Sequence, residues 1–67
     1  MPRKIRQLIK DLHDAGFELI SGAAKGSHRK LAHANYHGAV TLSGNDNDDA
    51  KHYQEKQVQR AIEEVQA

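Results

Sequence analysis

The sequence contains no cysteine and no tryptophan, and its 67 residues include only one phenylalanine and two tyrosines. Without cysteine the chain can form no disulfide framework, thiol nucleophile, thiolate-bound zinc or iron–sulfur site. This composition fits a reducing cytosol, so we expect a cytoplasmic protein. A chain of this length buries only about 60% of its surface on folding, and only 37% of its residues are hydrophobic. We therefore expect a single domain over residues 1–67, with a thin core and no deep substrate cavity.

Long hydrophobic runs are also missing. No apolar stretch approaches the roughly 20 residues that a membrane-spanning helix needs. The first residues, Met1–Lys4, lead into an amphipathic segment and not into the apolar core of a signal peptide. The sequence therefore predicts neither membrane insertion nor secretion.

The charge is unevenly distributed, although the net charge is only +1. Residues 1–33 hold seven Lys/Arg and three Asp/Glu, whereas residues 34–67 hold three and six. The two halves thus carry +4 and −3. This asymmetry predicts that the N-terminal half meets an anionic partner, of which nucleic acid is the commonest.

Two apolar stripes at helical spacing mark the ends of the chain. The first consists of Ile5, Leu8, Ile9 and Leu12, and the second of Val58, Ala61, Ile62 and Val65. They predict helices over residues 2–15 and 53–66, with Gly16 as the left-handed residue that ends the first. Before the second helix, the polar stretch 44–49 can only be a loop. We expect Asp48 or Asp49 to cap the helix and not to bind a metal, because the spacing of a calcium loop is absent.

The segments between the helices alternate with the period of β-strands. We expect strands over residues 17–21, 27–33 and 39–43, the last two joined as a hairpin, with Phe17 and Leu19 facing the helices. The order is then α-β-β-β-α, an α+β fold. Its three-stranded antiparallel sheet should have two helices packed on one face, because each helix has a single apolar stripe. The other sheet face stays open to solvent.

The second predicted strand carries the chemistry. If Leu31 points to the helices, His28 and Lys30 fall on the open face, and Arg29 and His33 fall on the side of Leu31. The stretch Lys25-Gly26-Ser27-His28-Arg29-Lys30 combines three cations, a hydroxyl, an imidazole and a glycine that lets a phosphate approach the backbone.

Cleavage of RNA without a metal requires a base, an acid and positive charge near the phosphorus. Histidine, with an ordinary pKa of about 6.5, can perform either proton transfer near neutrality. A second group is then needed, and the sequence leaves it open among Lys30, Lys25, His33 and water.

Simpler interpretations compete with catalysis. Taken alone, the residues favour a basic strand that merely binds phosphate, with His28 an incidental exposed side chain. The same strand could instead dock on an acidic protein partner. A metal site is not expected, because His28 and His33 are five residues apart and so lie on opposite faces of a continuous strand.

At Gly26-Ser27-His28 the chain resembles the HicA family of toxin–antitoxin systems, and the likeness covers nearly its whole length. Gly26-Ser27-His28 matches the Gly-Ser-His motif that the family carries on its second strand. Further segments are similar to the family's opening helix and strand, its third strand and the ending of one branch: Leu8–Phe17, Val40–Leu42, Asp48–Lys51, Tyr53–Lys56 and Val58–Val65.

The resemblance implies a small ribonuclease toxin, an mRNA interferase, whose fold is like that of double-stranded-RNA-binding domains. It implies that His28 is the catalytic residue, that translated mRNA is the substrate, and that a HicB-type antitoxin neutralises the toxin by covering this face. With the open-face placement, it leads us to predict RNA-binding roles for the neighbouring residues. Lys25, Arg29 and Lys30 should hold the phosphate backbone, and Gly26 and Ser27 should shape its approach. No cofactor, metal or homo-oligomer is required. The alternative is a non-catalytic RNA-binding module of the same fold.

Overall fold

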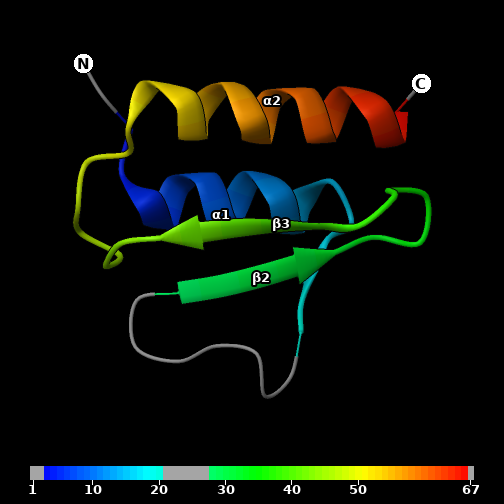
Figure 1. Ribbon diagram of the computed structural model, residues 1–67, viewed down its shortest axis with the longest axis horizontal. Coiled ribbons are helices and arrows are strands. Elements are labelled where there is room, and N and C mark those ends of the chain that lie inside the picture. The colour runs from blue at the N-terminus through cyan, green and yellow to red at the C-terminus, as the bar shows by residue number, and fades with distance from the viewer. Residues whose placement is uncertain (1–2, 21–27, 67) are drawn as a thin grey trace.

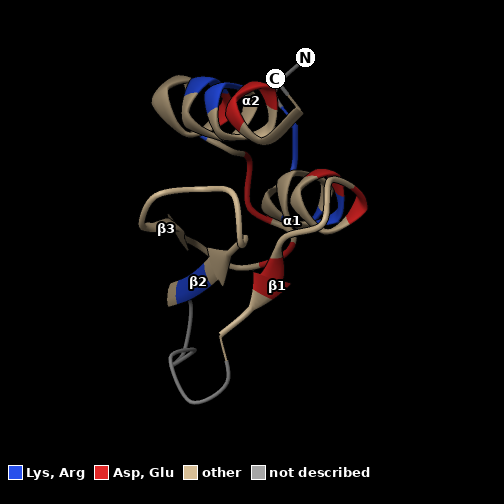
Figure 2. Cartoon of the chain, turned by 90° about the vertical axis from the view of Figure 1, so that its right-hand side faces the viewer, with Lys and Arg blue, Asp and Glu red and all other residues tan. Residues whose placement is uncertain are grey.

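The computed structural model describes residues 3–20 and 28–66 (Figure 1). Its elements are, in chain order, α1 (Ile5–Asp14), β1 (Glu18–Leu19), β2 (His28–Ala32), β3 (Ala39–Ser43) and α2 (His52–Gln66). The strands form one antiparallel sheet in the order β1-β2-β3. Both helices lie on the same side of this sheet (Figures 1 and 2). The predicted α-β-β-β-α order and the α+β class are therefore confirmed.

The core lies between the helices and the sheet. Its buried members come from both helices, from β2 and β3 and from the segments beside them: Ile5, Leu8, Leu12, Phe17, Leu31, Val40, Leu42, Ala50, Val58 and Ala61. Phe17 is fully buried, and its ring packs edge-on against Tyr36 at a centroid distance of 5.5 Å. Neither α1 nor α2, the helices of the described residues, is long and apolar enough to cross a membrane.

The first helix and strand differ from the prediction at their ends. Helix α1 begins at Ile5 and not at residue 2, and residues 1 and 2 lie outside the described residues. Gly16 follows the helix with a φ of 100°, which confirms the predicted left-handed stop.

Strand β1 is two residues long, and the expectation that Leu19 faces the helices is confirmed. Leu19 pairs with the buried Leu31, so the two side chains share the helix-facing side. Leu19 is nevertheless 50% exposed, because β1 is an edge strand of the sheet.

The polar loop before α2 holds the helices and the sheet together. Its backbone carbonyls at Asp46 and Asp48 accept hydrogen bonds from the amides of Arg6 (3.1 Å) and Ile5 (3.0 Å). These amides belong to the first turn of α1 and have no partner within the helix. The loop therefore caps α1, a helix that lies about 40 residues earlier in the chain.

The expectation that Asp48 or Asp49 caps α2 is wrong. The carboxylate of Asp48 accepts a hydrogen bond from the Asn45 amide at 2.9 Å, and that of Asp49 pairs with Lys4 at 2.7 Å. Gln54 closes the first turn of α2 instead, because its side-chain oxygen accepts a hydrogen bond from the Lys51 amide at 2.8 Å. Loop aspartates are common helix caps, but here Asp48 accepts from an amide of its own loop and Asp49 pairs with Lys4, which is distant in sequence.

Candidate nucleic-acid interface

The register of β2 against β3 decides which side chains of β2 share a face. Arg29 pairs with Leu42, and Leu31 pairs with Val40. Because these three apolar residues are buried, this side of β2 faces the helices.

The alternate residues of β2 lie on the other side of the sheet. His28 pairs with Ser43, and Lys30 pairs with Thr41. His28 and Lys30 are both exposed. The prediction that they are neighbours on the open face is confirmed.

The two cations of β2 have different surroundings. Arg29 is directed to the helix side, where its side chain is 19% exposed and forms an ion pair with Asp46. It also donates a hydrogen bond to the Gly44 carbonyl at 3.4 Å. Lys30 has no ion pair with any carboxylate of the described residues. Lys30 is thus available to an anion on the open face, whereas Arg29 already has an anionic partner on the opposite side.

Two hydroxyl residues join His28 and Lys30 on the open face, and sequence reasoning did not name them as site residues. Ser43 lies opposite His28 and Thr41 lies opposite Lys30, so each pair has Cα atoms about 5 Å apart. Hydroxyls can donate hydrogen bonds to phosphate oxygens. The alternation around Val40 and Leu42 could have placed both hydroxyls on the open face, but their pairing partners depend on the register of the hairpin.

Glu18 brings a negative charge to the far end of the open face. It pairs with Ala32, four residues along β2 from His28, or about 13 Å at the rise of a strand. Figure 2 shows the acidic position on β1 and the basic positions on β2. A polyanion is therefore favoured at the end of the face that carries His28 and Lys30.

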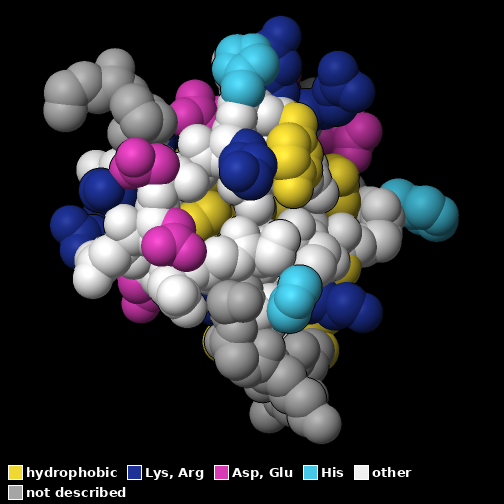
Figure 3. Space-filling view, turned by 60° about the vertical axis from the view of Figure 1, so that its left-hand side comes forward, with side chains coloured by type: hydrophobic (Ala, Val, Ile, Leu, Met, Phe, Trp, Pro, Cys, Tyr) yellow, Lys and Arg dark blue, Asp and Glu magenta, His cyan; other side chains and the backbone are white. Residues whose placement is uncertain are grey.

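The other histidines do not add to this site. The Nδ1 atom of His33 accepts a hydrogen bond from the Asn35 amide at 2.9 Å, and its ring lies 5.1 Å from that of Phe17. This places His33 beside the core and away from His28. Histidine side chains lie apart from one another over the surface (Figure 3). Within residues 3–20 and 28–66, no three His, Asp or Glu side chains are grouped so that they could hold a metal ion.

Three predicted site residues, Lys25, Gly26 and Ser27, lie outside the described residues. Their roles stay predictions.

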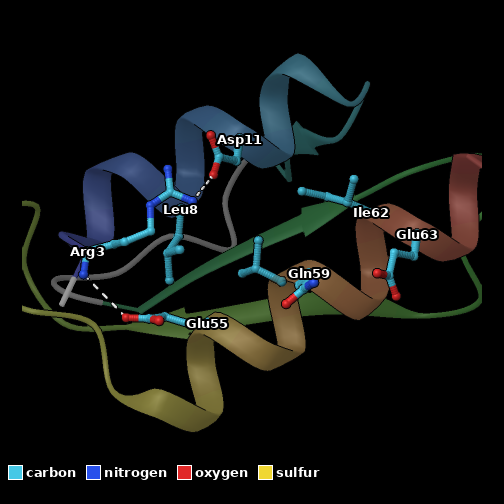
Figure 4. Close-up of a pocket in the computed structure, with 8 residues that line it drawn as sticks. Arg3, Leu8, Asp11, Glu55, Gln59, Ile62 and Glu63 are labelled. Carbon is cyan, nitrogen blue, oxygen red and sulfur yellow. Dashed lines mark hydrogen bonds and ion pairs between the residues drawn. The ribbon is translucent and has the colours of Figure 1, made fainter. Parts of the chain in front are cut away.

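A groove between α1 and α2 offers a contrasting surface. It has a volume of about 260 Å³ and is lined by Arg3, Leu8, Asp11, Glu55, Val58, Gln59, Ile62 and Glu63. The guanidinium of Arg3 pairs with Asp11, and its backbone amide donates to Glu55 at 3.3 Å (Figure 4). Since three carboxylates and one cation border the groove, it repels a polyanion.

Comparison with known proteins adds to this geometry. Residues 5–64 match the family described as the HicA toxin of bacterial toxin-antitoxin. The chain belongs to the HicA toxin family. No curated protein and no solved structure gives a significant match. Membership of this family makes the protein the toxin of a toxin–antitoxin system, and such a toxin has an antitoxin as its partner.

Proposed function

We propose that this HicA toxin is a metal-independent endoribonuclease that cleaves mRNA, with His28 as its catalytic residue. The observation that supports this most is the position of His28, which is exposed on the open sheet face beside Lys30. An exposed strand suits this task, because a long polyanion can lie across a flat face and needs no enclosing cavity. The proposal includes a cytoplasmic location, where mRNA is translated.

The reaction needs two proton transfers at one phosphodiester. A base takes the proton of the 2′-hydroxyl, the O2′–P bond forms and the P–O5′ bond breaks. An acid then protonates the leaving 5′-oxygen. His28 performs one of these transfers. Of the four candidates for the other, His33 is directed to Phe17, so the second role falls to Lys30, Lys25 or water.

Positive charge must balance the negative charge that builds up on the phosphoryl oxygens. Lys30 is the described residue best placed for this, because it shares the open face with His28 and has no carboxylate partner among the described residues. From the sequence we assign a similar role to Lys25. We also expect Gly26 and Ser27 to shape the approach of the RNA backbone to this face. The ion pair of Arg29 with Asp46 favours a structural role for Arg29 over the RNA contact expected from the sequence.

The antitoxin partner should be of the HicB type and should cover the open face. An antitoxin bound to this face would prevent RNA from contacting both His28 and Lys30. The acidic groove between the helices lies on the other side of the sheet and does not take part in this proposal.

A non-catalytic RNA-binding module is the second candidate. It is favoured by the lack of a second histidine on the open face of the described strands. A pure binder would retain RNA in a salt-dependent manner and release no fragments.

The test compares His28→Ala with His13→Ala, which removes another exposed histidine from the last turn of α1. We expect the wild type and His13→Ala to arrest growth on induction and to fragment purified mRNA in the presence of EDTA. His28→Ala should do neither. Cleavage by His28→Ala would refute the assignment, and binding without fragments by the wild type would establish the second candidate.

A further inference from the structure

An aromatic and basic surface, formed by α2 and by Tyr36 of the segment between β2 and β3, is not used by the proposed reaction. We call it the α2 patch, and it consists of Tyr36, Tyr53, Lys56, Gln57 and Arg60. These residues line a hollow of about 350 Å³. Tyr53 is 60% exposed, although large aromatic side chains are usually shielded from water in a small domain. In Figure 3, hydrophobic side chains lie among Lys and Arg side chains at the α2 end of the molecule.

The two cations of the α2 patch lie one turn apart on the helix. Lys56 and Arg60 are four residues apart, and like charges at this spacing destabilise a helix. Neither forms an ion pair within the described part of the chain, although Glu63 borders a neighbouring hollow with both of them. Two unpaired cations beside an exposed ring form a surface suited to an anionic, aromatic ligand.

Single-stranded nucleic acid has this chemistry. Its bases stack on aromatic side chains, and its phosphates are held by lysine and arginine. The exposed ring of Tyr53 offers a stacking surface, and Lys56 and Arg60 follow it by one and two helical turns. A duplex would offer phosphates but no free base for this ring.

The α2 patch is connected to the catalytic face. His28 lies opposite Ser43, and the Ser43 carbonyl accepts a hydrogen bond from the Gln54 side chain at 2.9 Å. Tyr53 adjoins Gln54 and also lines a second hollow, of about 450 Å³, which reaches Ser43. A strand leaving His28 across the edge of β3 would therefore arrive at Tyr53.

Two carboxylates border this route. Asp48 and Asp49 line the second hollow together with Lys51. The ion pair of Asp49 with Lys4 and the charge of Lys51 reduce their repulsion of a phosphate. The route is thus close to neutral, and the positive charge lies at its two ends.

We propose that the α2 patch binds single-stranded RNA next to the cleaved phosphodiester, with one base stacked on Tyr53 and the adjoining phosphates on Lys56 and Arg60. This inference rests on the proposed function for the identity of the ligand. It adds a second contact area that extends the substrate beyond the sheet.

Binding is measured in the His28→Ala variant of the 67-residue chain, so that cleavage does not interfere. The probe is an unstructured oligoribonucleotide with a fluorophore at its 5′ end. We expect Tyr53→Ala to raise the Kd about tenfold, whereas Tyr53→Phe keeps the ring and changes it less than about twofold. Replacing Lys56 and Arg60 together by Gln should reduce the slope of log K against log salt by about 1.4. Lys10→Gln, at an exposed lysine on α1, should leave the slope unchanged.

A second measurement reports on Tyr53 itself. Tyr36→Phe leaves Tyr53 as the single tyrosine of the chain, and stacking of a base should quench its fluorescence as RNA is added. Unchanged fluorescence together with an unchanged Kd for Tyr53→Ala would overturn the proposal.

Failure of this proposal can be told apart from failure of the proposed function. If the wild type cleaves RNA and Tyr53→Ala has the same KM and Kd, the α2 patch is refuted and the nuclease stands. If the wild type never cleaves but Tyr53 is quenched and its replacement weakens binding, the α2 patch stands and the nuclease is refuted. Variants of the α2 patch that bind RNA normally but lose the antitoxin would identify a protein interface and refute RNA binding there.

Discussion

The two sides of β2 carry residues of similar type in opposite situations. On the helix side, Arg29 is largely covered and paired with Asp46, next to the fully buried Leu31. On the open side, His28 and Lys30 are exposed, and Lys30 has no carboxylate partner within the described residues. Arg29 and Lys30 are adjacent in sequence and both cationic, yet of the two only Arg29 forms an ion pair within the described residues.

This difference shows how a small chain separates stability from chemistry. A chain of 67 residues can build only one layer of core, and here the core lies on the helix side of the sheet. Residues on the open side then contribute little to folding and are free to contact a ligand. Substitutions on the two sides of β2 should therefore affect different measurements.

The largest effect on stability is expected for Leu31→Ala. Removing a fully buried leucine side chain costs about 2–5 kcal/mol, against a total of about 3–10 kcal/mol for a chain of this length. We expect the variant to be largely unfolded or to unfold at much lower urea, as followed by circular dichroism. Lys30→Ala is the control and should change the free energy of unfolding by less than about 0.5 kcal/mol. Equal losses for the two variants would show that the sides of β2 do not differ.

A smaller effect on stability is expected for Arg29, and it distinguishes Arg29 from Lys30. Arg29→Gln removes the pair with Asp46 and part of the packing of the arginine stem, so it should cost about 1 kcal/mol. It should leave the salt dependence of RNA binding unchanged. Lys30→Gln should leave stability unchanged and reduce the slope of log K against log salt by about 0.7. Urea titration checks the stability of the two variants, and RNA binding at several salt concentrations checks their slopes. A reduced slope for Arg29→Gln with an unchanged slope for Lys30→Gln would place the RNA on the helix side.

The smallest effect is expected at the exposed pair of Lys10 and Asp14 on α1, which lies 2.8 Å apart. The hydrogen bond from Lys10, with its charge, lowers the pKa of Asp14, and the same contact raises the pKa of Lys10. Because the folded pKa of Asp14 is lowered, its contribution is present above the unfolded value of about 3.9. It is lost as the pH falls through the folded pKa.

Asp14→Asn tests this contribution. The wild-type Tm should exceed that of the variant slightly at pH 5, and the gap should close as the pH is lowered below about 4. High salt should also close it, since both groups are exposed. A gap that widens in acid would reverse the assigned direction. This pair gives the baseline against which the partly covered pair of Arg29 and Asp46 can be judged.

Local patterns were sufficient to predict the elements and the two sides of β2. The stripe of α1 and the alternation around Leu31 follow from periods of 3.6 and 2 residues, which need no knowledge of the tertiary structure. The placement of His28 and Lys30 on the open face follows from the same alternation.

Features that depend on distant partners could not be predicted in this way. The exposure of Leu19 depends on the position of β1 at the sheet edge. The ion pair of Asp49 with Lys4, and the capping of α1 by the loop before α2, join segments about 40 residues apart. Ser43 became a neighbour of His28 only through the register of the hairpin.

We propose that His28 performs chemistry and contributes nothing to the fold. The most direct measurement follows urea unfolding and RNA cleavage in EDTA on the same preparations of wild type and His28→Ala. We expect free energies of unfolding that agree within about 0.5 kcal/mol, with cleavage present in the wild type and absent from the variant. Undiminished cleavage by a folded His28→Ala protein would contradict it.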